Sequence, residues 1–277
     1  FFAWRGAGAA NRFGFGNHRP QPRRQHPHIG FQHHAVVITG HLDHLEVQAQ
    51  RLHHLTGTHA FKRFGHGFMG RSDHASARGV AQGSHAAHMV GITEEIMCQG
   101  MRADFNKVDE VSKRLLEKAK VAKEIVVKSR HGTDLVATFN PDFTWRKTSG
   151  IIEEVWSNLP GGEIFTAPWS VDGIFVIDGT VGDYFSHKYG TLDKTPMTLF
   201  IEGGYLKKAL CDNKELEKEF WEYCHTAEGS NRVGEFAIGT NLAVFEFTGN
   251  LLQDEKMPGV HIAFGDPYGS QTGADWT

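Results

Sequence analysis

The chain has 277 residues, a net charge of −3 and an apolar fraction of 40%, values typical of a soluble globular protein with room for one or two domains. No apolar run approaches the roughly eighteen residues of a transmembrane helix, which argues against a membrane-spanning protein. The three cysteines, Cys98, Cys211 and Cys224, form no Cys-x-x-Cys pair, which argues against a disulfide framework and a structural zinc site. We therefore expect three buried or half-buried thiols and a reducing, cytoplasmic compartment.

Residues 1–88 differ in composition from the rest of the chain. They hold fourteen of the eighteen histidines, ten Lys and Arg residues and only three acids, whereas residues 89–277 hold nineteen Lys and Arg residues against twenty-nine acids. Three interpretations compete: a basic arm for nucleic acid, a His-rich metal-binding tract, and a non-native segment from a misread coding frame. We favour the third, because arginine and histidine replace lysine and acids are nearly absent. We expect low order here, with neither nucleic acid nor membrane as a partner.

From Met89 onward the pattern is that of an ordinary globular protein. Asp104 precedes a predicted helix over about 106–121, with Val108, Val111, Leu115 and Ala119 on one stripe. A hairpin is predicted from 124–129 to 134–139, and a second helix over 214–226 places Leu216, Phe220 and Tyr223/Cys224 inward. Further strands are predicted at 163–167, 173–177, 197–201, 234–238 and 259–264; Val36-Val-Ile-Thr39 is a candidate short strand.

This pattern predicts an α+β fold: a mixed, strand-rich catalytic domain with few helices, preceded by a poorly ordered or non-native N-terminal segment. Strands outnumber helices, and there is no regular alternation of strand and helix that would indicate a parallel sheet. We divide the chain into an atypical segment 1–88, a connecting α/β segment 89–150 and a metal-binding catalytic domain 151–277.

Three predicted strands each carry a ligand-type side chain beside glycine. Glu163 follows Pro160-Gly-Gly, Glu235 follows Gly234, and His261 lies between Gly259 and Gly265. Val260, Ile262 and Phe264 occupy one face of the last strand, which leaves His261 on the other. Two carboxylates and an imidazole on short strands suit a divalent metal site, and glycine lets backbones approach closely. On spacing alone, however, outward-facing Glu and His residues are more often solvated surface.

The sequence segments around these residues resemble those of one protein family. Asn158-Leu-Pro-Gly-Gly-Glu-Ile-Phe-Thr-Ala-Pro168, Val233-Gly-Glu-Phe-Ala-Ile-Gly-Thr-Asn241, Asp254-Glu-Lys256 and Val260-His-Ile-Ala-Phe-Gly265 occur in this order. Together they resemble the metallopeptidase family of aminopeptidase T and aminopeptidase S, and the likeness runs from about residue 89 to 277.

The resemblance implies a binuclear centre with two divalent ions, Zn, Co or Mn. Glu163, Glu235 and His261 match the glutamates and the histidine of the first, second and third ligand motifs. Tyr268 matches a tyrosine at the active site, where it donates a hydrogen bond or a proton to the tetrahedral intermediate or supports the metal ligands from the outer sphere; its alternative role is to cap the core. The implied function is aminopeptidase hydrolysis of peptides by metal-activated water, with Glu235 and Tyr268 as catalytic residues and a homodimer as the assembly.

The family completes its site with a His-x-Asp pair shortly after a Gly-rich loop. Gly269–Gly273 resembles that loop, but no His-x-Asp follows it in this sequence. We therefore expect a fragment, with further ligands beyond Thr277. We also expect this chain by itself to bind metal poorly and to hydrolyse little.

Two other functions stay open. Some relatives of these peptidases resemble iron(II) ring-cleaving dioxygenases of dihydroxypyridines, which need a single iron and a His/His/Asp triad; retention of Glu163 and Glu235 favours two metals instead. The other alternative is a non-catalytic His-rich metal-binding or basic interaction protein in residues 1–88. Outside the motifs, we expect His187 to be solvated, Cys224 to serve packing and His225 to be exposed.

Overall fold

The computed structural model describes residues 36–40, 44–46, 86–152 and 156–276. The chain divides into two compact units, Phe1–Gln32 and His33–Thr277, and every described residue belongs to the second. Most of residues 1–88, and with them the three interpretations of the N-terminal histidines, lie outside the described residues.

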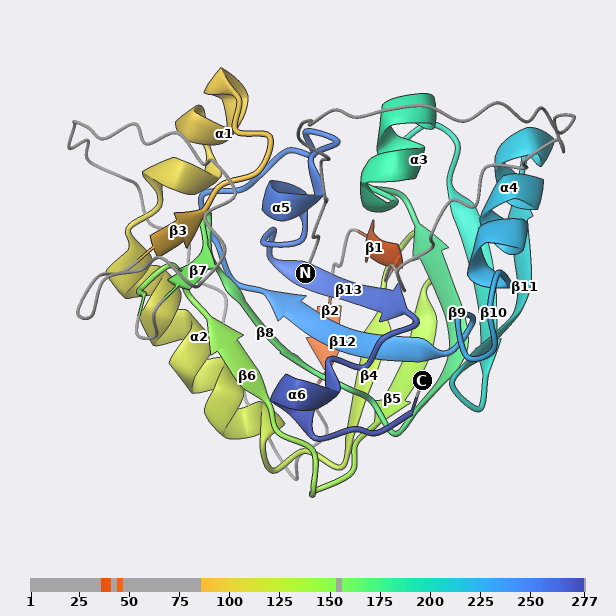
Figure 1. The fold of residues 1–277 in the computed structure, drawn as a ribbon, viewed down its shortest axis with the longest axis horizontal. Helices are drawn as coiled ribbons and strands as arrows, with labels where there is room; N and C mark the ends of the chain where they lie inside the picture. Colours follow the sequence, from red (N-terminus) through yellow and green to blue (C-terminus); the bar gives the residue numbers. More distant parts are fainter. Residues whose placement is uncertain (1–35, 41–43, 47–85, 153–155, 277) are drawn as a thin grey trace, which may run out of the picture. The chain divides into compact units, whose positions relative to one another are not determined.

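Two antiparallel sheets dominate the second unit (Figure 1). The five-stranded sheet has the order β1-β13-β12-β8-β6, and the six-stranded sheet has the order β11-β10-β9-β5-β4-β2. A parallel pair, β3 and β7, stands apart. The strands are β1 Val36–Gly40, β2 His44–Glu46, β3 Ala86–His88, β4 Glu124–Lys128, β5 Asp134–Thr138, β6 Arg146–Thr148, β7 Trp156–Asn158, β8 Glu163–Thr166, β9 Ser170–Ile177, β10 Met197–Glu202, β11 Tyr205–Cys211, β12 Val233–Gly239 and β13 Gly259–Phe264.

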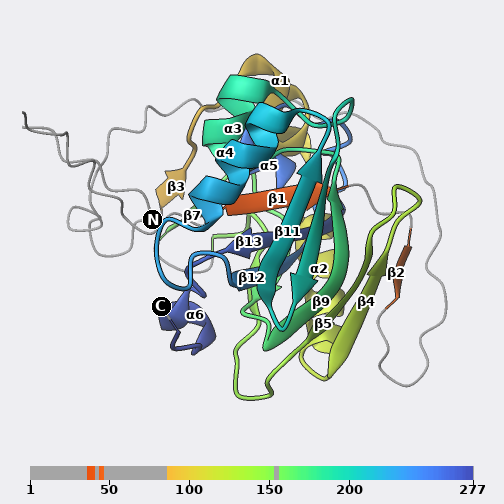
Figure 2. The ribbon, with the colours of Figure 1, turned by 90° about the vertical axis from the view of Figure 1, so that its right-hand side faces the viewer.

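The helices are fewer and mostly short, and Figure 2 shows α4 lying along β11. None of the helices in the described part of the chain is long and apolar enough to cross a membrane. The helices are α1 Glu94–Cys98, the 3-10 turn η1 Gly100–Arg102, α2 Phe105–Ala119, α3 Gly182–Tyr189, α4 Lys214–Cys224, α5 Leu251–Asp254 and α6 Gly269–Thr272.

The core lies between the two sheets, because each sheet turns one apolar face inward. Ile164, Phe236 and Ile262 of the five-stranded sheet join Phe175 and Leu199 of the six-stranded sheet in one buried cluster. Because successive side chains of a strand point to opposite faces, β8, β12 and β13 each have a second face that does not pack against this core. That second face carries the candidate site.

Helix α2 begins where the sequence predicts, but its buried stripe is rotated. The Asp104 side chain accepts hydrogen bonds from the backbone N–H groups of Asn106 and Lys107, which caps the helix. Asp109 and Ser112 are buried beside Val108 and Ala119, whereas the predicted Val111 and Leu115 are only half-buried. The reason is polar pairing: Asp109 binds Lys147 of β6, and the Ser112 hydroxyl lies 2.7 Å from that of Thr240.

The predicted α+β, strand-rich fold is confirmed. The 124–139 hairpin, the α4 helix with its buried Leu216, Phe220 and Cys224, and the strand over 259–264 all form as expected. Strands from both sides of residue 150 share the two sheets, since β6 pairs with β8 and β5 with β9. The functional division at residue 150 stays a prediction.

One expectation about the cysteines is wrong. Cys211 and Cys224 are buried, but Cys98 is exposed, and all three thiols are free. Cys98 ends the five-residue helix α1, whose one buried side chain is that of Ile96. So short a helix covers little core, and its last residue faces solvent.

Candidate metal centre

The register of strand pairing places the predicted site residues on one face of the five-stranded sheet. Ala237 of β12 pairs with His261 of β13 and with Phe165 of β8, and Gly239 pairs with Glu163. Because paired residues in an antiparallel sheet point to the same side, Glu163 and His261 share the face opposite the core. Glu235 pairs with Ala263 beside a bulge in β12 and belongs to the same row.

The turn after α5, residues 255–258, lies over this face. Gly239 makes the approach possible, since a Cβ added there would lie 1.8 Å from the carbonyl oxygen of Met257. The backbone N–H of Asn241 donates to the Lys256 carbonyl at 2.9 Å, which ties the turn to the end of β12. Glu255 and Lys256 therefore reach Glu163 from above the sheet.

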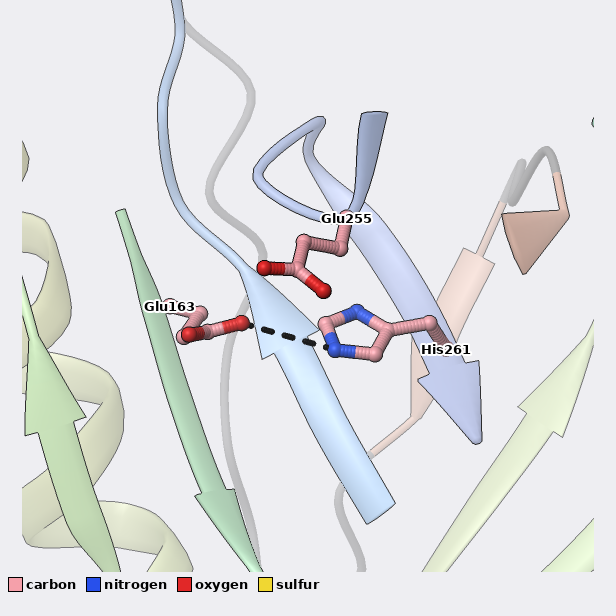
Figure 3. Close-up of side chains that lie close together, drawn as sticks. All are labelled: Glu163, Glu255 and His261. Carbon is pink, nitrogen blue, oxygen red and sulfur yellow. Dashed lines mark ion pairs between the residues drawn. The ribbon is translucent and has the colours of Figure 1, made fainter. Parts of the chain in front are cut away.

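Three ligand-type side chains converge there. Glu163, Glu255 and His261 each offer one ligand atom, and these atoms all lie within 4.8 Å of one another. His261 Nε2 lies 3.5 Å from Glu163 Oε2. Figure 3 shows the three side chains, from β8, the turn after α5 and β13, pointing toward one another across β12. The structure thus brings Glu163 and His261 together and adds Glu255.

Glu163 has two further partners on its other oxygen. The Thr148 hydroxyl of β6 donates to Oε1 at 2.9 Å, and the Lys256 ammonium donates to the same oxygen at 2.6 Å. Lys256 also binds Glu255. Oε1 is therefore held by the protein, while Oε2 faces His261.

Burial and charge set the protonation states of these groups. Burial would raise the pKa of Glu163, but Lys256 and His261 beside it, with the Thr148 hydrogen bond, lower it below the ordinary value. Burial raises the pKa of Glu255 to about 7 against the opposing effect of Lys256. Burial and the nearby Lys256 lower the pKa of His261 to about 4, although Glu163 acts in the opposite direction. At neutral pH the His261 imidazole is therefore uncharged.

An uncharged buried imidazole fits a metal ligand. His261 is 2% exposed, and its buried Nε2 has no hydrogen-bond partner among the residues that the structure describes. Such an atom is costly unless a further group satisfies it. A nitrogen lone pair and two carboxylates are the donor set that zinc and similar ions take from proteins. The residues present therefore fit a divalent cation.

Glu235 lies near this group without being one of its three members. It is 7% exposed, and burial followed by repulsion from Glu163 and Glu255 raises its pKa well above the ordinary value. Its proposed roles as ligand and catalytic group stay predictions.

Tyr268 adjoins the site with a constrained backbone. Its φ of 52° lies in the left-handed region, which non-glycine residues seldom adopt, and its N–H donates to the Asp266 side chain at 2.8 Å. Its ring packs edge-on against Phe165, with ring centroids 6.1 Å apart. Burial raises its pKa well above the ordinary value, and the charges of Glu235, Glu255 and Glu163 add to the effect. The phenol thus stays protonated and close to the carboxylates.

Sequence reasoning missed Glu255, Lys256 and Thr148 as members of the site. The available signal was the Asp254-Glu-Lys256 motif, which lies just before the His261 strand. Other expectations hold: His187 and His225 are exposed and Cys224 is buried. His187 lies in the last turn of α3.

The site and fold define a class: an α+β protein whose buried His and Glu side chains fit a divalent cation. The family model of the thermophilic metalloproteases (M29) matches residues 98–275. The chain belongs to the thermophilic metalloprotease (M29) family.

Two similar solved structures have low sequence identity to the chain. Wild-type AmpT from Thermus thermophilus is 21% identical with a TM-score of 0.44, over 61% of this chain and 43% of that one. A 2,5-dihydroxypyridine dioxygenase from Pseudomonas putida KT2440 is 16% identical with a TM-score of 0.46, over 64% of this chain and 59% of that one. The chain thus spans less than two thirds of either structure's length. A comparison with curated proteins gives no match.

Proposed function

We propose that this metalloprotease-family chain carries the metal centre of an aminopeptidase that removes N-terminal residues from peptides. The observation that carries the proposal is the buried Nε2 of His261, which faces the carboxylates of Glu163 and Glu255 and has no hydrogen-bond partner within the described part of the chain. Three protein ligands with one open position are the usual arrangement of a catalytic zinc ion.

Glu163, Glu255 and His261 would hold the first ion, and Glu235 would contribute to a second. A divalent ion bound there would acidify a water molecule and polarise the peptide carbonyl. The choice of an aminopeptidase within this proposal rests on the resemblance of the motifs around Glu163, Glu235 and His261 to those of aminopeptidases T and S.

The number of ligand atoms limits the metal binding and the hydrolysis that we expect of the 277-residue chain by itself. The three grouped ligand atoms suffice for one ion, whereas a binuclear centre needs additional donors. We therefore propose that this chain holds one ion weakly and hydrolyses peptides slowly. The homodimer implied by the family resemblance and the cytoplasmic location inferred from the cysteines belong to the same proposal.

The test is metal binding followed by hydrolysis. The chain would be stripped with chelator and titrated with Zn²⁺, Co²⁺ and Mn²⁺ by calorimetry, and then assayed on dipeptides with free and with acetylated N-termini. We expect one ion per chain and slow, metal-dependent cleavage of the free-amine peptides alone. Failure of all three ions to bind, or equal cleavage of the acetylated peptides, would contradict the proposal. Oxygen consumption with Fe²⁺ and a dihydroxypyridine would favour the dioxygenase alternative.

Tyr268→Phe tests the proposed proton donor. Removing the phenol hydroxyl takes away one hydrogen bond to the tetrahedral intermediate and leaves the cation ligands in place. We expect kcat for the slow hydrolysis to fall by at least about tenfold. The Zn²⁺ affinity should stay at the wild-type value. Tyr184→Phe, on the exposed surface of α3, is the control and should change neither quantity. A Tyr268→Phe variant with wild-type kcat would leave Tyr268 with a packing role.

A further inference from the structure

The ammonium of Lys256 binds the two carboxylates that a divalent metal ion would use as ligands. Its side chain is 0% exposed, and its ammonium binds both Glu163, at 2.6 Å, and Glu255. These are the two carboxylates that, with His261, bring their ligand atoms within 4.8 Å of one another. A buried lysine and a divalent ion thus have the same two acidic partners.

Hydrogen bonds fix the backbone of Lys256, whereas its long side chain has several rotatable bonds. The backbone N–H donates to the Gln253 carbonyl at 2.8 Å, and the carbonyl accepts from Asn241 at 2.9 Å. The four-carbon stem of lysine ends in a compact charge with no fixed geometry, so the ammonium can leave a partner without movement of the chain. Glu163 keeps its Thr148 hydrogen bond when the ammonium leaves.

For electrostatic reasons, the Lys256 ammonium and a divalent ion compete for the two carboxylates. Two buried carboxylates at such close range repel each other unless a positive charge lies between them. The ammonium supplies that charge in the metal-free chain. A divalent ion bound to the same two carboxylates would lie close to the ammonium, and the repulsion between these two positive charges in a buried site is strong.

We propose that Lys256 is the resident cation of the centre: it holds Glu163 and Glu255 together without metal, and an incoming divalent ion must displace its ammonium. Lys256 therefore stabilises the empty site and lowers its affinity for metal. The inference rests on the proposed function, because it assigns a regulatory role to a residue of the same site.

The experiment compares the 277-residue chain with Lys256→Met and Lys256→Gln. Methionine keeps the apolar stem, and glutamine keeps a hydrogen-bond donor for the carboxylates without the charge. Zn²⁺ affinity is measured by calorimetry against a competing chelator, and metal-free Tm by scanning calorimetry. We expect both variants to bind Zn²⁺ about ten- to hundredfold more tightly. We also expect Lys256→Met to lower the metal-free Tm by roughly 5–15 °C.

Lys147→Met is the matched control, because the partly buried Lys147 also pairs with a carboxylate, Asp109, but lies in register with Ile164 of the core face. It should lower the metal-free Tm and leave Zn²⁺ affinity at the wild-type value. Equal or weaker binding by both Lys256 variants, with a wild-type chain that binds Zn²⁺, would overturn the role of Lys256 alone. If neither the wild-type chain nor any of the variants binds Zn²⁺, both the proposed metal centre and the proposed competition by Lys256 are wrong. If Lys256→Met does not fold, the affinity of Lys256→Gln decides.

Discussion

Glu163→Gln is expected to weaken Zn²⁺ binding by the chain on the order of a hundredfold or more. Glu163 lies at the middle of the group: one oxygen faces His261 Nε2 at 3.5 Å, and the other accepts from Lys256 and Thr148. Glutamine keeps the shape and removes the charge that a divalent ion needs. Calorimetric titration of the metal-free variant measures the loss.

The control for this substitution is Asp109→Asn. Asp109 is a buried carboxylate paired with a lysine, like Glu163, but it lies on α2 beside Lys147 and Ser149. Its replacement removes the negative charge that pairs with Lys147 and should lower stability without changing Zn²⁺ affinity. Equal loss of affinity in both variants would mean that Glu163 acts through stability and not as a ligand.

Gly239→Ala should have the second large effect, on both stability and metal binding. The added Cβ would lie 1.8 Å from the Met257 carbonyl oxygen, so the turn that carries Glu255 and Lys256 must move away from β12. Overpacking against backbone costs about 3 kcal/mol or more, which corresponds to a fall in Tm of roughly 6–12 °C. Displacement of Glu255 should also reduce Zn²⁺ affinity by at least about tenfold. Thermal unfolding and calorimetric titration measure the two effects.

Gly182→Ala separates steric from backbone effects. Gly182 has a φ of 49°, and no atom of the other described residues beyond its chain neighbours lies within 4 Å of an added Cβ, so alanine there introduces backbone strain alone. It should cost about 1 kcal/mol and leave Zn²⁺ affinity unchanged. If Gly239→Ala behaves in the same way, the turn is free to relax and the close approach at Gly239 does not position Glu255.

Elements with a regular apolar pattern could be predicted from the sequence, and those without one could not. The strand at β13 alternates between core and site residues, and α4 repeats buried positions at helical spacing, so both were found. Helix α3 begins after Val181 without a side-chain cap. Strand β11 has two exposed lysines, Lys207 and Lys208, in succession beside a register shift in β10. Neither gives the local signal on which such predictions depend.

The sequence by itself determined the α+β class, the family and the placement of Glu163, Glu235 and His261 on strands, because strand alternation and short motifs are local properties. The close approach of Glu163, Glu255 and His261, and the position of Lys256 between the two carboxylates, were decided only by the tertiary structure. The pairing of β12 with both β8 and β13 joins residues far apart along the chain, and so does the close approach of the 255–258 turn to Gly239. Such register and close approach depend on packing, for which a single sequence contains no direct signal.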